Sequence, residues 1–159
     1  MNRFVKIIPA ATALLLTLAF CVSCRSVPPL PPADLSAPGW QVRQGQAVWR
    51  PPGNRPELTG DLLLATNMNG CFFVQLTKNP FPLVTAEVFG DQWQIEFGAE
   101  EHSWRGRGEP PERFIWFRLP RALLDGKVPG NWRFENVTAN SWRLNNPRTG
   151  EKLEGGFFP

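Results

Sequence analysis

From Trp40 to the end of the chain, apolar and polar residues alternate in short runs that end at glycine, proline or asparagine. In the run from Gln92 to Phe97, Trp93, Ile95 and Phe97 alternate with glutamine and glutamate. Because successive side chains of a strand point to opposite faces, this run predicts a strand with one apolar and one polar face. Such runs recur at fairly even spacing, which is typical of an antiparallel sheet or barrel.

The alternation predicts a mainly β protein, an antiparallel meander of about nine or ten strands. The expected strands are Trp40 to Arg50, Leu58 to Ala65, Cys71 to Thr77, Leu83 to Phe89, Gln92 to Phe97, a short strand within Glu100 to Glu112, Arg113 to Phe117, Trp132 to Val137, Ser141 to Asn145 and Glu151 to Phe158. One helix is expected from Pro120 to Asp125, since proline suits a first turn and Gly126 follows its end. One short helix cannot cover so large an apolar face, so we expect the sheet to curl into a half-barrel or small barrel.

The first residues of the chain follow another pattern. A short basic start is followed by an apolar run from Ile7 to Phe20, which is too short to span a bilayer comfortably. Residues 1–23 are therefore expected to be a secretory signal that is removed. The junction Ser23-Cys24 resembles the bacterial lipoprotein signal, in which a small residue precedes a cysteine that becomes lipidated. This resemblance implies a lipid on Cys24; Cys21, which follows a bulky phenylalanine, is the poorer acceptor.

The segment that follows, residues 24–39, is rich in proline. Its prolines are Pro28, Pro29, Pro31, Pro32 and Pro38. Fixed backbone angles disfavour helix and sheet, so we expect an extended, semi-rigid spacer between the lipid and a single domain of residues 40–159. In lipoproteins of this kind, aspartate directly after the lipidated cysteine favours the inner membrane. Arg25 occupies that position here, which implies the periplasmic face of the outer membrane, with the protein attached through its lipid.

Composition narrows the possible partners. The chain has 17 Lys and Arg residues against 14 Asp and Glu residues, and Arg3 and Lys6 belong to the leader. The remaining chain is close to neutral, which argues against a nucleic-acid partner. Once the leader is removed and Cys24 is lipidated, Cys71 is the only free thiol, so no disulfide is expected within the chain. Its apolar neighbours predict a buried, inert thiol.

Catalytic chemistry is not expected. His102 is the only histidine, so a site with several histidines around a metal is excluded. The carboxylates lie mostly in turns or on polar faces, and no two of them form a specific pair. We therefore expect a protein that is not an enzyme and carries no cofactor or metal.

The aromatic residues are the main candidates for binding. All seven tryptophans lie between Trp40 and Trp142. They either fill the core or line a cavity for an acyl chain, which offers apolar area and no hydrogen bonds. The residues predicted to bind a ligand are Trp93, Ile95, Phe97, Trp132, Phe134, Trp142 and Leu144. Phe81, in a turn between two prolines, either touches a membrane or partner or closes one end of the barrel.

A lipidated cysteine, a proline tether and a strand meander with an apolar concave face together resemble the LolA/LolB-like lipoprotein-carrier superfamily. The resemblance covers most of Trp40 to Phe158 and rests on organisation. It implies a non-enzymatic half-barrel that binds lipid or an acylated protein, with Phe81 as the counterpart of the receptor's protruding apolar residue. Two alternatives stay open: a structural lipoprotein that holds an envelope complex through its sheet, and a binder of envelope glycans. The protein is expected to be a monomer or part of an envelope complex.

Overall fold

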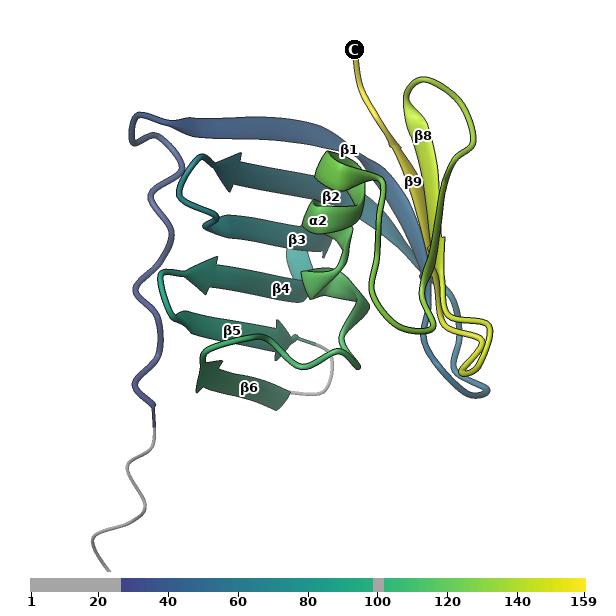
Figure 1. Ribbon diagram of the computed structural model, residues 1–159, viewed down its shortest axis with the longest axis horizontal. Coiled ribbons are helices and arrows are strands. Elements are labelled where there is room, and N and C mark those ends of the chain that lie inside the picture. Colours follow the sequence, from purple (N-terminus) through teal and green to yellow (C-terminus); the bar gives the residue numbers. More distant parts are fainter. Residues whose placement is uncertain (1–26, 99–101) are drawn as a thin grey trace, which may run out of the picture.

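The computed structural model describes residues 27–98 and 102–159, and nine strands within these ranges form one antiparallel sheet (Figure 1). The predictions for the leader, Cys24 and Arg25 lie outside the described residues. The strands are β1 (Trp40–Arg50), β2 (Leu58–Asn67), β3 (Phe72–Lys78), β4 (Phe81–Phe89), β5 (Gln92–Phe97), β6 (His102–Arg107), β7 (Arg133–Asn136), β8 (Ser141–Asn145) and β9 (Lys152–Phe157). Their order in the sheet is β6-β5-β4-β3-β2-β1-β9-β8-β7. The predicted mainly β meander is confirmed.

The sheet is bent into an open half-barrel and does not close. In Figure 1, β2 to β6 form one wall, β8 and β9 form the other, and β1 runs along both. β1 pairs with β2 over most of its length and with β9 from Gly45 onward. A Cβ atom at Gly45 would overlap the carbonyl oxygen of Gly156 on β9. The absence of a side chain there lets the two strands approach closely where the walls diverge.

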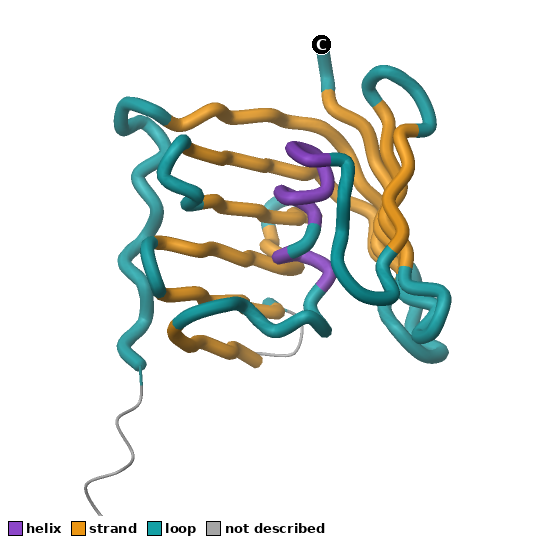
Figure 2. Tube along the Cα trace, in the orientation of Figure 1, coloured by secondary structure: helices purple, strands orange, loops and turns teal. Residues whose placement is uncertain are grey.

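The chain between β6 and β7 crosses the concave face of the sheet. It contains a short 3₁₀ helix, η1 (Ile115–Phe117), followed by helix α2 (Leu119–Asp125), and both lie across the strands in Figure 2. The side chain of Trp116 meets the ring of Trp49 edge to face at 5.3 Å, and Phe117 meets Trp93 at 5.7 Å. The interior of the half-barrel is therefore filled by side chains of the crossing segment.

The prediction of a strand from Arg113 to Phe117 is wrong. A strand would point Trp116 away from its two apolar neighbours, toward the opposite face. Instead Ile115, Trp116 and Phe117 are all at most 2 % exposed. Because the segment lies inside the half-barrel, apolar surface surrounds it and all three consecutive side chains can be buried. The helix that follows agrees with the prediction: Gly126 caps it with a left-handed backbone at φ 64°.

A tight turn joins β2 and β3. The side-chain oxygen of Asn67 accepts hydrogen bonds from the backbone N–H groups of Asn69 and Cys71, at 2.9 and 3.2 Å. Gly70 adopts a φ of 77°, which suits glycine. Cys71 is a buried free thiol, as its apolar neighbours predict.

The proline-rich segment is packed on the domain from Val27 onward. Val27, Leu30 and Ala33 are half-buried while the prolines between them are exposed, a spacing of three that matches the polyproline II helix. The Leu30 backbone N–H donates a hydrogen bond to Gln94 Oε1 at 3.0 Å. This contact helps to bury Gln94, although it lies on the polar face of β5. The described part of the predicted spacer is thus in contact with the sheet.

Gly106 on β6 pairs across the sheet with Trp93, and the indole ring occupies the space above it. A Cβ atom at Gly106 would lie 2.7 Å from Cε2 of that ring. We expect Gly106→Ala to lower the free energy of unfolding by about 1–3 kcal/mol, because Trp93 must move within a packed core. Urea denaturation would measure this. Ser103→Ala, an exposed change on the same strand, should alter stability by less than about 0.5 kcal/mol; equal effects would contradict the packing.

Candidate functional site

An apolar groove opens at one end of the half-barrel, where β1 and β5 end and β2 and β4 begin. One part has a volume of about 390 Å³ and is lined by Trp49, Pro51, Arg55, Pro56, Leu58, Leu83 and Phe97. A second part, of about 240 Å³, is lined by Trp49, Pro52, Arg55, Phe97, Trp104, Arg113, Phe114 and Glu151. Because Trp49, Arg55 and Phe97 line both parts, we treat them as one surface, called the aromatic groove.

Four rings from different elements meet in the aromatic groove. Phe97 at the end of β5 lies 5.7 Å from Trp49 on β1 and 5.7 Å from Trp104 on β6. Phe114, from the crossing segment, lies 5.6 Å from Trp104. Phe97, Trp104 and Phe114 are only partly buried, so ring surface is left for a ligand. Such a surface suits an apolar chain, whose binding is driven by area rather than hydrogen bonds.

Glu151 contributes a buried carboxyl group to the groove. The residue is 5 % exposed. The Trp49 indole N–H donates a hydrogen bond to its Oε1 at 3.0 Å. Burial raises the pKa of Glu151 to about 7, and the hydrogen bond from Trp49 only partly offsets this. Near neutral pH the carboxyl is therefore divided between its neutral and charged forms.

Two arginines border the groove. The Arg113 guanidinium lies 4.7 Å from the ring centre of Phe114 and 6.0 Å from that of Trp104. Stacking on aromatic faces holds an arginine while leaving its N–H groups at the edge of the ring for other partners. Arg55 lines both parts of the groove. The groove thus combines apolar walls with cationic groups, which suits an apolar chain that ends in an acidic group.

The structure does not bring the seven predicted ligand residues together. Ile95, Trp142 and Leu144 are at most 2 % exposed and belong to the core. Trp132 is also buried, and its indole N–H donates to the Glu112 carbonyl at 3.1 Å.

The other three predicted residues are partly buried, and they lie in different parts of the structure. Trp93 packs on Phe117 inside the half-barrel, and Phe134 lies on the edge strand β7. Only Phe97 lines the aromatic groove. The strands that carry these residues lie on two walls, with η1 between them.

Several groove residues were not predicted. The sequence marks Trp49 and Trp104 only as two of the seven tryptophans, and it places Phe114 in the strand expected from Arg113 to Phe117. Glu151 gives no signal of burial in the sequence, because it is a charged residue at the start of the predicted strand Glu151 to Phe158 and directly follows Gly150. Its burial follows from its contact with Trp49, 102 positions earlier in the chain.

Phe81 begins β4 at the same end of the half-barrel as the groove, two residues before Leu83. Its side chain is 70 % exposed. The alternative that Phe81 closes the end of the barrel is therefore wrong. A contact with a membrane or a partner stays a prediction.

Within residues 27–98 and 102–159, no three His, Cys, Asp or Glu side chains are grouped so that they could hold a metal ion. In the same part of the chain, no helix has the length and apolar character needed to cross a membrane.

Comparison of the sequence with protein-family models and with curated proteins found no match. The resemblance to the LolA/LolB-like carriers thus stays a prediction from organisation.

Proposed function

We propose that this chain is a lipid-anchored, non-enzymatic protein of the bacterial outer membrane that binds the acyl chain of a lipid or lipoprotein. The sequence of the leader and of the Ser23-Cys24 junction supports the anchor. The aromatic groove supports the binding, because partly exposed rings of Phe97, Trp104 and Phe114 surround an open apolar surface.

The proposed ligand enters at the end of the half-barrel and not along its centre. The concave face is occupied by Trp116 and Phe117, both at most 2 % exposed. The larger part of the groove, about 390 Å³, is in the size range of small-molecule sites. In this position an acidic end group of the ligand lies within reach of Arg55 or Arg113, while its chain covers Phe97.

Tryptophan fluorescence of a chain lacking residues 1–24, titrated with a long-chain fatty acid, tests this proposal. We expect a saturable blue shift, because the ligand would exclude water from Trp104. Phe97→Ala should weaken binding by about tenfold, since it removes the ring shared by both parts of the groove.

Phe89→Ala, which changes an exposed ring on another part of the sheet, is the matched control and should bind as the unmodified chain does. Circular dichroism would verify that both variants fold. Absence of a saturable shift, or equal affinity for Phe97→Ala, would contradict acyl-chain binding in the groove.

One observation favours the second candidate, a structural lipoprotein of an envelope complex. β6 and β7 are the outer strands of the sheet, so each leaves backbone groups that a partner strand could pair with. Copurification from envelope membranes would separate the two functions. A partner that is lost with Ser103→Pro on β6 and kept with Phe97→Ala would favour assembly through the edge.

A further inference from the structure

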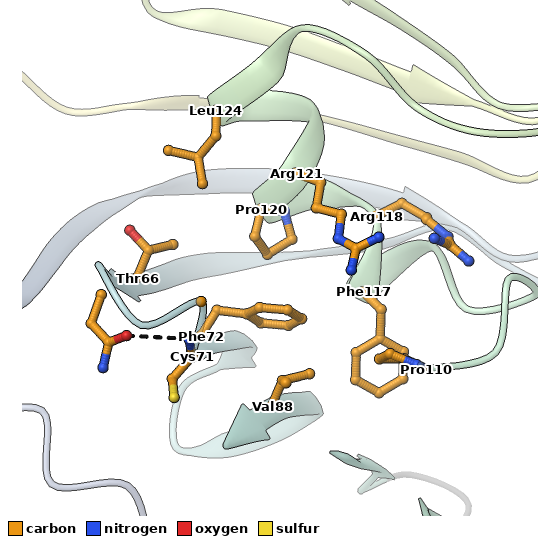
Figure 3. A pocket seen from close by; sticks show the side chains of 12 residues that line it. Thr66, Cys71, Phe72, Val88, Pro110, Phe117, Arg118, Pro120, Arg121 and Leu124 are labelled. Atoms are coloured by element: carbon orange, nitrogen blue, oxygen red, sulfur yellow. Dashed lines mark hydrogen bonds between the residues drawn. The ribbon is translucent and has the colours of Figure 1, made fainter. Parts of the chain in front are cut away.

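A second pocket lies at the opposite end of the half-barrel from the aromatic groove. Its volume is about 190 Å³, and β2 and β4 end beside it while β3 begins there. Phe72, Val88, Phe117 and Pro120 give it apolar walls, and Arg118 and Arg121 also line it (Figure 3). We call it the arginine pocket. It shares no lining residue with the aromatic groove.

Arg118 is a buried cation without a close partner. The residue is 6 % exposed, and its Nε has no hydrogen-bond partner among the described residues. The nearest carboxylate oxygen belongs to Glu112, 3.9 Å away, on a side chain that is 71 % exposed. Burial lowers the pKa of Arg118, which reflects the poor solvation of its charge. The terminal N–H groups of Arg118 also make no hydrogen bond within the part of the chain that the structure describes, so an anion that reaches them would give this charge a close partner.

Arg121 provides a second guanidinium at the same pocket. It follows Arg118 by three positions, and residues three positions apart are neighbours on the surface of a helix. In Figure 3 the Arg121 guanidinium points from α2 toward Phe117. Its carboxylate neighbour, Glu109, lies 3.8 Å away and is 88 % exposed, a loose pair that water screens. Arg121 can therefore turn to an anion that lies beside the guanidinium of Arg118, and guanidinium groups match phosphate oxygens in geometry.

The rim of the arginine pocket is apolar and exposed. Leu124, which lines the pocket, is 69 % exposed, and Met68, in the turn between two lining residues, is 95 % exposed. Phe72 and Val88 also line a neighbouring pocket, and residues 30–34 of the N-terminal segment form part of its wall. The N-terminal segment therefore reaches the domain at this end. If Cys24 carries lipid, as the proposed function has it, this end faces the membrane.

We infer that the arginine pocket binds the phosphate of a membrane phospholipid, with Arg118 and Arg121 as its cationic groups. A volume of about 190 Å³ fits a headgroup and not a whole acyl chain. Leu124 and Met68 then touch the apolar layer beside the bound headgroup. This site adds to the acyl-chain groove and does not depend on it.

Isothermal titration calorimetry tests the inference on the full chain in micelles of an uncharged detergent. The probes are dihexanoyl phosphatidylglycerol, dihexanoylglycerol, which lacks the phosphate, and inorganic phosphate. We expect saturable binding of the phosphatidylglycerol alone. Arg121→Gln should weaken it by about tenfold, since a charge-assisted contact is lost. Arg50→Gln removes an arginine at the other end of the half-barrel and should leave binding unchanged.

Three outcomes would overturn the inference. Equal affinity of Arg121→Gln and the unmodified chain would show that phosphatidylglycerol does not bind in the arginine pocket. Equal binding of dihexanoylglycerol would show apolar contact only, and equal binding of inorganic phosphate would show a site for free anions. Arg118→Lys, which keeps the buried charge and loses the guanidinium geometry, should also bind more weakly. Phe97→Ala should not affect phosphatidylglycerol binding, so failure of the acyl-chain groove would be recognised separately.

Discussion

Replacing Trp116 by alanine is expected to lower the free energy of unfolding by about 3–5 kcal/mol. The side chain is 1 % exposed and lies inside the half-barrel, edge to face with Trp49. Strand β1 belongs to both walls, so the walls cannot close on the cavity that alanine would leave. Urea denaturation followed by far-ultraviolet circular dichroism would measure the change without relying on tryptophan emission.

Trp116→Phe is the matched control. The Trp116 indole N–H has no hydrogen-bond partner among the described residues, so phenylalanine loses no hydrogen bond and keeps most of the apolar volume. We expect a loss of about 1–2 kcal/mol. A loss below about 1 kcal/mol for Trp116→Ala would contradict the position of η1 in the core.

The second large effect concerns Glu151 and pH. Its pKa rises from 4.5 to about 7 on folding, so between these values the folded chain binds more protons than the unfolded chain. The contribution of Glu151 to stability is therefore full below about pH 4.5 and is lost as the pH rises through 7. Each pKa unit corresponds to about 1.4 kcal/mol, so the loss is roughly 3 kcal/mol at pH 8.

Glu151→Gln should remove this loss, because glutamine keeps an oxygen for the Trp49 N–H and never ionises. We expect the variant to match the unmodified chain near pH 4 and to exceed its stability by roughly 3 kcal/mol at pH 8. Urea denaturation at several pH values would measure the difference. Parallel stability curves for the two proteins would contradict the buried position of Glu151.

Glu154→Gln is a control, because the contribution of Glu154 to stability depends on pH in the opposite direction. The hydrogen bond from Lys152, and then the one from Arg143, lower the pKa of Glu154. Its contribution to stability is present at neutral pH and is lost as the pH falls through the pKa of the folded state. Glu154→Gln should therefore destabilise the protein slightly at neutral pH and have less effect in acid.

The sequence by itself determined most of the strands, although the strand expected from Arg113 to Phe117 is wrong. The bounds of β1, β5 and β8 coincide with the predicted runs, because alternation depends on which faces of one strand are covered. The end of α2 at Gly126 was also predicted, since it depends on local hydrogen bonds and backbone angles.

Only the tertiary structure decided what fills the half-barrel and which rings stay open to a ligand. Trp93 and Phe97 lie on the same face of one strand, yet the first packs on Phe117 and the second lines the aromatic groove. This difference depends on where the crossing segment lies, and no local pattern specifies that. The burial of Glu151 likewise depends on Trp49, brought to it by the pairing of β1 with β9. Contacts between distant parts of the chain, and not local alternation, create these sites.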